Sequence, residues 1–391
     1  MHEAQEPETK SYVKSTIEFR EKTTPQVLDN IQGKDENPEL YAVVYNSVKA
    51  TLDLIADKIE AKDIDPSVME NIRLSQADIK NRGPAERIQG EARIGLFPVA
   101  ANPIHWGQLV AALKEMAEQN LSGVVFVLQG PGDTDKPEVE LTMAERLEMA
   151  KAMLGEFGGI FKASTISYET RGRGEKTVFD LIGLNEDLVD PDKLADDGSR
   201  VTWAYMAGSD HEHVWKESVI QSHFGEPDYF EKPMASYDFD EELDTIGKFY
   251  QSIEQKREYL RQIGHHIEVF FNNRPGNKVT QYHVEAARLA EAAGLFTYRE
   301  FNGQPFAASS TEIRKRITGI PSREAAVTLP KIVMNYIDGP GYQRYRSIIT
   351  ASHYQQKLGI GGQDFDRAQF DKLVNRTVAV LPPGTKNDQA P

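Results

Sequence analysis

Apolar residues follow two different spacings along the chain, and the change between them divides the sequence. From Leu40 to Ile59 they recur at steps of three and four, which predicts an amphipathic helix capped by Asn37. A second helical stretch is predicted over about 66–81. We therefore predict that residues 1–90 form an N-terminal helical extension.

Beyond residue 91, short apolar runs alternate with helical patterns. Strands are predicted at 92–99, 123–128, 161–167, 201–208, 266–272 and 296–301, and helices at 105–118, after the capping box that begins at Thr142, and at about 281–293. Strands that alternate with helices indicate βαβ units and a sheet covered on both faces. The predicted fold class is therefore α/β: a Rossmann-like, doubly wound and mainly parallel sheet, with the N-terminal extension and helical insertions.

Two stretches do not fit a compact sheet. Residues 169–200 are rich in Gly, Asp, Arg and Lys, and residues 216–262 hold many acids and a predicted helix. We interpret both as insertions in a central domain of residues 91–338. Residues 339–391 are predicted to form a C-terminal helical segment and a polar tail.

Composition and charge narrow the classes of function. The chain has 391 residues, of which 39% are hydrophobic, and a formal net charge of −15. An acidic surface repels nucleic-acid phosphates, so no nucleic-acid partner is expected. The absence of cysteine excludes disulfides, thiolate nucleophiles and zinc–thiolate sites.

No membrane partner is expected either, because the chain has no run of 18 apolar residues. The polar N-terminus lacks the basic and apolar regions of a secretory signal. We therefore expect a cytoplasmic protein.

The first candidate site lies where a predicted strand runs through a glycine-containing turn into a helix. Gly95, Phe97 and Gly107 belong to this stretch. Backbone N–H groups at such a helix start can hold a phosphate. His105 and Gln108 are three residues apart and share a helix face, where they can hold the oxygens of a nucleoside triphosphate. The alternative is a plain strand–turn–helix with a partly buried histidine.

The second candidate site is a helix start near residue 310. Ser309 and Glu312 form a capping box, and the hydroxyls of Ser310 and Thr311 accompany the free N–H groups of the first turn. Arg314 lies one turn further on and can bridge phosphate oxygens with its planar fork. A well-capped basic surface helix is the alternative.

Together the two stretches resemble the nucleotidyltransferase superfamily with the H-x-G-H signature, and most of all the nicotinate/nicotinamide mononucleotide adenylyltransferases. That family opens with G-x-F-x-P-x-H-x-G-H and closes with I-S-S-T-x-I-R. Residues 102–108 match the first pattern in part, and residues 309–314 match the second well. The chain departs from the family in having Gln108 in place of the second histidine, and in extra residues between Phe97 and Pro103.

Shorter pieces of sequence between the two sites extend the resemblance. They lie at Lys136, Arg146, Gly208 with Asp210, Trp215, and Arg274, in the order in which the family has them. The resemblance implies three groups of site residues. The catalytic residues are His105, Gln108 and Arg314; the ATP-binding residues are Gly95, Phe97, Gly107, Gly208, Asp210, Ser309, Ser310 and Thr311; and the substrate-binding residues are Lys136, Arg146, Trp215 and Arg274.

The resemblance also implies a reaction. ATP and nicotinate or nicotinamide mononucleotide would give the dinucleotide and pyrophosphate, with Mg²⁺ carried on ATP. The partners expected are thus ATP and a mononucleotide, while the choice of base and a homo-oligomeric state stay open. Other acceptors remain alternatives: a different phosphorylated metabolite, or a carboxylate, as in pantothenate synthetase, against which the closing motif argues. A third alternative is an impaired nucleotide-binding protein, because glutamine cannot become cationic.

A protein-bound metal is not expected. His211 with His213, and His265 with His266, have spacings that do not place zinc ligands without distant partners. Trp106 is expected to pack in the core rather than to stack on a base.

Overall fold

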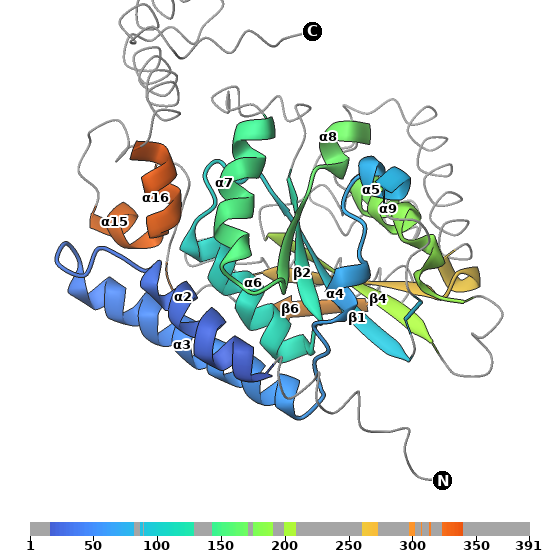
Figure 1. Ribbon diagram of the computed structural model, residues 1–391, viewed down its shortest axis with the longest axis horizontal. Helices are drawn as coiled ribbons and strands as arrows, with labels where there is room; N and C mark the ends of the chain where they lie inside the picture. Colours follow the sequence, from blue (N-terminus) through green and yellow to red (C-terminus); the bar gives the residue numbers. More distant parts are fainter. Residues whose placement is uncertain are drawn as a thin grey trace, which may run out of the picture.

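A six-stranded parallel sheet lies at the centre of the computed structural model (Figure 1). The structure describes residues 16–81, 87–88, 90–128, 143–170, 175–190, 199–208, 260–272, 297–301, 306, 313 and 323–338. The strands are β1 (Glu91–Val99), β2 (Gly123–Leu128), β3 (Phe161–Ser164), β4 (Arg200–Gly208), β5 (His265–Asn272) and β6 (Thr297–Phe301). Their spatial order is β3-β2-β1-β4-β5-β6, and every neighbouring pair is parallel.

This strand order is that of the doubly wound Rossmann architecture. The chain has a Rossmann-like fold. The predicted fold class is therefore confirmed, and the direction of winding reverses between β1 and β4. Ligands of such sheets bind outside the carboxyl ends of the strands at that reversal.

Both faces of the sheet are buried, with side chains alternating between two hydrophobic clusters. In β1, Ile94 and Leu96 belong to one cluster, and Phe97 and Val99 to the other. This period of two is what a strand produces. Because each face needs apolar cover, the strands read as continuous apolar runs in the sequence.

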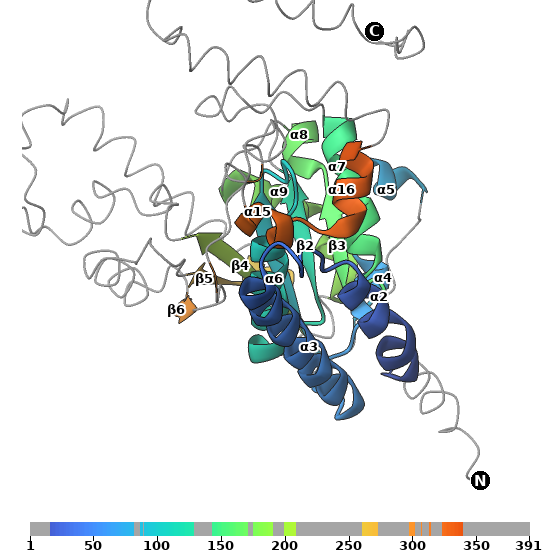
Figure 2. The same cartoon turned by 90° about the vertical axis from the view of Figure 1, so that its left-hand side faces the viewer.

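Helices cover the two faces unequally (Figures 1 and 2). The face of Phe97 is covered by α2 (Thr24–Asp29), α3 (Pro38–Glu60), α6 (Trp106–Gln119), α7 (Met143–Gly155), α15 (Arg323–Thr328) and α16 (Lys331–Asp338). The face of Ile94 is covered by α4 (Val68–Asn71), α8 (Ile166–Thr170) and α9 (Glu175–Leu184). The shorter elements η1 (Phe19–Thr23), α5 (Gln76–Asn81) and η2 (Glu186–Leu188) complete the described set.

Helix α3 forms as predicted and becomes part of the core. The Oδ1 of Asn37 accepts a hydrogen bond from the N–H of Leu40 at 3.1 Å, which caps the helix, and Pro38 begins it. Its buried stripe, from Val44 to Ile59, joins the cluster that α6 also enters. The described N-terminal residues therefore share one core with the sheet, while the division of the chain into domains stays a prediction.

The first predicted insertion, 169–200, contains α9, which packs against the sheet. Leu181 and Ile182 of α9 are fully buried in the cluster on the Ile94 face. The helix covers the sheet on the way from β3 to β4 and is integral to the fold. Of the second predicted insertion, only 260–262 lie within the described residues. The helix predicted at about 281–293 and the segment 339–391 lie outside the described residues.

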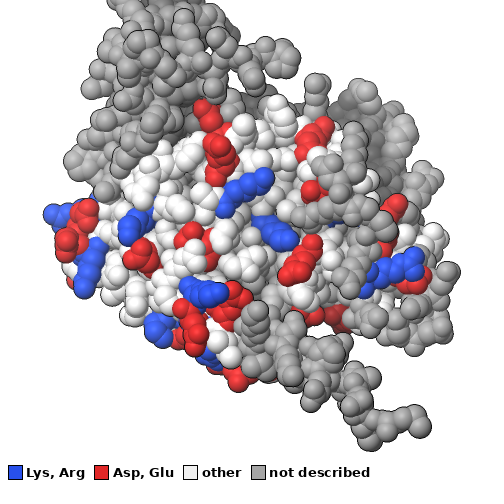
Figure 3. Space-filling model, viewed as in Figure 1, with Lys and Arg blue, Asp and Glu red and all other residues white. Residues whose placement is uncertain are grey.

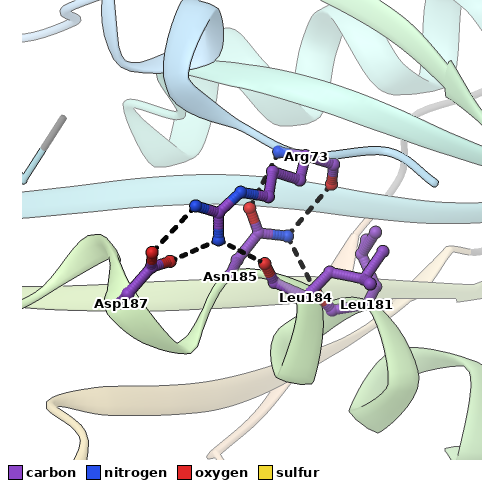
Figure 4. A network of polar contacts seen from close by, with 5 residues as sticks. All are labelled: Arg73, Leu181, Leu184, Asn185 and Asp187. Atoms are coloured by element: carbon purple, nitrogen blue, oxygen red, sulfur yellow. Dashed lines mark hydrogen bonds and ion pairs between the residues drawn. The ribbon is translucent and has the colours of Figure 1, made fainter. Parts of the chain in front are cut away.

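A buried polar network joins the N-terminal segment to α9 and η2 (Figure 4). Arg73 forms a two-pronged ion pair with Asp187, at 2.5 and 2.8 Å. The fully buried Asn185 accepts a hydrogen bond from the N–H of Arg73 and donates to the carbonyl oxygens of Arg73 and Leu181. These contacts satisfy backbone groups that would otherwise be buried without partners.

Residues 30–33 hold the described C-terminal helices in place. Asn30 accepts hydrogen bonds from the N–H groups of Lys331 (2.9 Å, to its carbonyl) and Ile332 (3.0 Å, to Oδ1). Gly33 has a φ of 81°, and a Cβ there would lie 2.7 Å from the carbonyl carbon of Ala326. Only glycine fits both constraints. Segments some 300 residues apart in sequence are thereby packed together.

The surface of the face seen in Figure 3 carries both signs of charge, interspersed. Exposed ion pairs among the described residues include Lys49 with Asp53 and Arg20 with Asp57. No broad basic area is visible among the described residues of that face. None of the described helices is both long and apolar enough to cross a membrane.

Candidate functional site

The turn between β1 and α6 lies at the point where the winding of the sheet reverses. β1 ends at Val99 and α6 begins at Trp106, while the neighbouring strand β4 ends at Gly208. Ala101 within the turn has a φ of 47°, a left-handed conformation that is uncommon for a residue with a side chain. Such strain is concentrated at functional sites.

The start of α6 is arranged to receive an anion. His105 is the N-cap residue, and its carbonyl oxygen accepts from the N–H groups of Gln108 (3.0 Å) and Leu109 (3.1 Å). The N–H groups of Trp106 and Gly107 have no partner inside the helix. They and the helix dipole favour a negative group at this end. The imidazole of His105 is 4% exposed and does not cap its own helix.

Two side chains of this first turn contain buried polar atoms that make no hydrogen bond. They are the Nε1 of Trp106, which is fully buried, and the Oε1 of Gln108, which is half-buried. Buried polar atoms are nearly always paired in folded proteins, so these two atoms are candidates for contact with a ligand. Rotating the Gln108 amide by half a turn would present its NH₂ group instead.

A buried arginine adjoins the same turn. Arg146 of α7 is 6% exposed, and its Nη1 donates a hydrogen bond to the carbonyl oxygen of Ala100 at 3.0 Å. Its Nε is buried without a hydrogen bond, and no acid in the described part of the chain pairs with it. Burial lowers the pKa of the guanidinium from its ordinary value. A positive charge in this position favours an anionic ligand.

Two of the predicted ATP-binding residues are closely packed inside β1. Gly95 lies inside β1, and a Cβ there would stand 2.9 Å from Cγ2 of Val124 and 3.1 Å from Cε of Met206. Phe97 is 5% exposed and packs its ring against Phe126, with centroids 5.5 Å apart. The strand continues to residue 99, so both residues precede the turn between β1 and α6. Trp106, expected to pack, is fully buried in the core.

Gly208 is the last residue of β4, next to the reversal point, and its role in ATP binding stays a prediction. Eight predicted residues lie outside the described part of the chain: Lys136, Asp210, Trp215, Arg274, Ser309, Ser310, Thr311 and Arg314. Ile313, within the second motif, is fully buried in the cluster that also holds Ile104 and Trp106. The structure thus brings residue 313 to the face on which α6 lies.

One buried pair was not predicted. Trp203 donates from Nε1 to Nδ1 of His265 at 3.0 Å, and both residues are buried. His265 begins β5, at the opposite end of the sheet from the β1–α6 turn. Within the described residues, no three His, Asp or Glu side chains come together as a metal site. His211 and His213 lie outside those residues.

Comparison with known proteins gives remote likenesses to solved structures. No protein-family model matches the chain, and no curated protein does. The chain is similar to Plasmodium falciparum nicotinic acid mononucleotide adenylyltransferase complexed with APC (TM-score 0.36, 12% identity) and with NaAD (TM-score 0.37, 13% identity), each covering 63% of this chain and 94% of that one.

It is also similar to Thermotoga maritima TmcAL bound with alpha-thio ATP, with a TM-score of 0.31 and 14% identity over 73% of this chain and 74% of that one. Likeness at this level carries no argument about activity. The fold rests on the strand order, and the site on its own contacts.

Proposed function

We propose that the chain is a nucleotidyltransferase that transfers AMP from ATP to nicotinate or nicotinamide mononucleotide and releases pyrophosphate. The observation that carries this proposal is the β1–α6 turn at the reversal point of the sheet. Its helix N–H groups and the buried Arg146 offer positive potential to an anion. The motifs around His105 and Arg314 resemble those of adenylyltransferases, which is why we propose that this anion is a nucleotide.

The proposed chemistry needs no protein nucleophile. An oxygen of the acceptor phosphate attacks the α-phosphorus of ATP in line, and the bond from that phosphorus to the α–β bridging oxygen breaks. Pyrophosphate leaves with the bonding electrons. Because the acceptor phosphate is already ionised, no base has to remove a proton. Catalysis would consist of positioning and charge neutralisation.

The described groups at this turn are suited to bind a phosphate rather than a bare cation. Helix N–H groups and a guanidinium donate hydrogen bonds and offer no oxygen ligands to Mg²⁺. Mg²⁺ would therefore be held by the triphosphate oxygens. His105 and Gly107 would contact the triphosphate from α6. Arg314 with residues 309–311, and Gly208 with Asp210, would complete the ATP site.

Lys136, Trp215 and Arg274 would contact the acceptor. These assignments rest on the sequence motifs. A different phosphorylated acceptor would use the same triphosphate site, so the acceptor is the part of the proposal to be tested by direct comparison of substrates.

Gln108 favours a second candidate function, a nucleotide-binding protein with impaired transfer. Glutamine can donate one hydrogen bond but carries no charge toward the transition state. Loss of one such stabilising donor commonly lowers rates by about 10²–10³-fold. This candidate predicts ATP binding without appreciable turnover.

Pyrophosphate release by the purified full-length chain tests the proposal. MgATP would be supplied with nicotinate mononucleotide, with nicotinamide mononucleotide, with a panel of other phosphorylated metabolites, or alone. Release that requires one mononucleotide supports the proposal and names the acceptor. Release with another acceptor only would replace the proposed substrate. Calorimetric ATP binding without release would favour the impaired protein, and absence of binding would exclude both.

A further inference from the structure

Arg146 differs from the other arginines that the structure describes inside the protein. Arg73, which is as deeply buried, is paired with Asp187, and Arg93 is paired with Glu268. Among the described residues, Arg146 donates only to a neutral carbonyl, that of Ala100. Its buried Nε has no acceptor.

An unpaired, buried arginine of this kind lowers the stability of the folded protein when no ligand is bound. A buried charge is normally balanced by an opposite charge or by a full set of hydrogen bonds, because its transfer from water is costly. The ion pairs of Arg73 and Arg93 provide that balance at their sites. The lowered pKa of Arg146, caused by burial, reflects the same cost. An uncompensated charge of this kind is typical of a site completed by a ligand.

Groups near Arg146 add to the positive electrostatic potential around it. The carbonyl it binds is that of the first residue after β1, and the turn leads within six residues to the start of α6. There the free N–H groups of Trp106 and Gly107 contribute partial positive charge. The indole N–H of Trp106 is a further unpaired donor, and Oε1 of Gln108 is the one unpaired acceptor among these atoms.

We infer that Arg146 is a positioning residue for a polyphosphate ligand, holding the β1–α6 turn through Ala100 and supplying it with a fixed positive charge. This inference rests on the proposed function and changes the role expected for Arg146. The residue is buried and would act through its hydrogen bond to the turn, whereas the sequence motif implied a direct contact with the substrate.

The inference predicts that removing the charge of Arg146 affects thermal stability and ligand affinity differently. In Arg146→Met the side chain keeps a similar length and loses its charge. We expect a melting temperature equal to or above that of the wild type, because an unbalanced buried charge is removed. We expect the affinity for inorganic tripolyphosphate and for MgATP to fall about 10- to 100-fold, as when a charged hydrogen-bonding group is lost. Arg146→Lys retains the charge and should recover most of the affinity.

Arg73→Met is the matched control. It removes an equally buried arginine that has a carboxylate partner away from the turn, and Asp187 loses its ion pair. It should lower the melting temperature and leave tripolyphosphate affinity unchanged. Melting would be followed by circular dichroism, and affinity by calorimetry with tripolyphosphate, which needs no turnover.

The inference is overturned if Arg146→Met melts below the wild type and binds tripolyphosphate as tightly, because Arg146 would then be only a structural tie to Ala100. If Arg146→Met does not fold, Arg146→Lys decides: retained affinity supports the inference and its complete loss contradicts it. Failure of the wild type to bind either tripolyphosphate or MgATP would remove the proposed function as well. Wild-type turnover with unchanged binding in Arg146→Met would remove only this inference.

Discussion

Trp203 of β4 donates a hydrogen bond to Nδ1 of His265 in β5, with 3.0 Å between the two nitrogens. Since Nδ1 accepts, the neutral imidazole carries its proton on Nε2. Both side chains are buried where the two strands pair, at Val201 opposite His265. The pair therefore makes the stability of this end of the sheet depend on the protonation of one imidazole.

Burial lowers the pKa of His265 from 6.5 to about 4, while the charge of Asp187 acts weakly in the opposite direction. The unfolded chain binds a proton at this residue below pH 6.5, but the folded chain does so only near pH 4. The contribution of neutral His265 to the free energy of unfolding is therefore complete above pH 6.5 and is lost as the pH falls toward 4. The free energy of unfolding should drop by about 3 kcal/mol in total from this residue.

Urea unfolding measured between pH 7 and pH 4.5 checks this expectation. His265→Asn retains an acceptor for Trp203 and cannot titrate, so its unfolding free energy should fall less steeply than that of the wild type. His266→Asn changes the exposed neighbour and should keep the wild-type slope. Equal slopes for the wild type and His265→Asn would contradict the account.

Asn185 is predicted to be a main stabilising residue of the contact between the N-terminal segment and α9. Asn185→Ala removes three hydrogen bonds and leaves the backbone N–H and carbonyl of Arg73 without those partners. The free energy of unfolding should fall by about 3 kcal/mol. Chemical denaturation measures the change. Lys49→Ala, which removes an exposed ion pair, should cause no measurable loss, and a comparable loss in both variants would argue against a special role for Asn185.

Gly95 is predicted to matter for packing and not for nucleotide binding. Gly95→Ala places a methyl group against Val124, Leu121 and Met206, and overpacking of this kind destabilises by about 1–3 kcal/mol. MgATP affinity should stay at the wild-type level. Gly183→Ala in α9 is the control, because a Cβ there meets nothing within 4 Å. Selective loss of ATP affinity in Gly95→Ala, with unchanged stability, would restore the phosphate-turn role.

Gln108→His tests the departure from the family signature. A histidine at this position can become cationic next to the triphosphate, and we expect the rate of transfer to rise about 10- to 100-fold. The KM for ATP should change little, because the gain would be made in the transition state. Steady-state pyrophosphate release measures both quantities. An unchanged or lower rate would mean that glutamine is not the limiting feature of the site.

The strands could be predicted because both faces of the sheet are covered. A parallel strand between two helical layers must be apolar along its length, and the runs at 123–128 and 201–208 have that composition. Helix α9 was missed as part of the core because its short apolar stretch lies among glycines and charges. The composition of the whole stretch 169–200 is polar because it includes the segments on either side of α9, whereas individual residues of the helix, such as Leu181, are fully buried.

The strand, turn and helix around the candidate site could be predicted from the sequence, whereas the roles of its residues stay predictions. The strand at 92–99 and the start of the helix near residue 105 were both predicted, but the tight packing of Gly95 against Val124 and Met206 has no local signal in the sequence. Arg146 lies on a helix where charges are usually exposed, so its burial depends on the tertiary contact with Ala100. The pairing of Trp203 with His265 joins residues on different strands and has no local signal.

Identification of the product tests the central claim most directly. The full-length chain would be incubated with MgATP and each mononucleotide, and the dinucleotide and pyrophosphate would be quantified by mass spectrometry and a coupled assay. The account predicts equal amounts of dinucleotide and pyrophosphate with one of the mononucleotides, and a lower rate in His105→Ala measured at a temperature at which that variant is folded. Release of ADP and phosphate in place of these products, or formation of the dinucleotide at the same rate in His105→Ala, would contradict it.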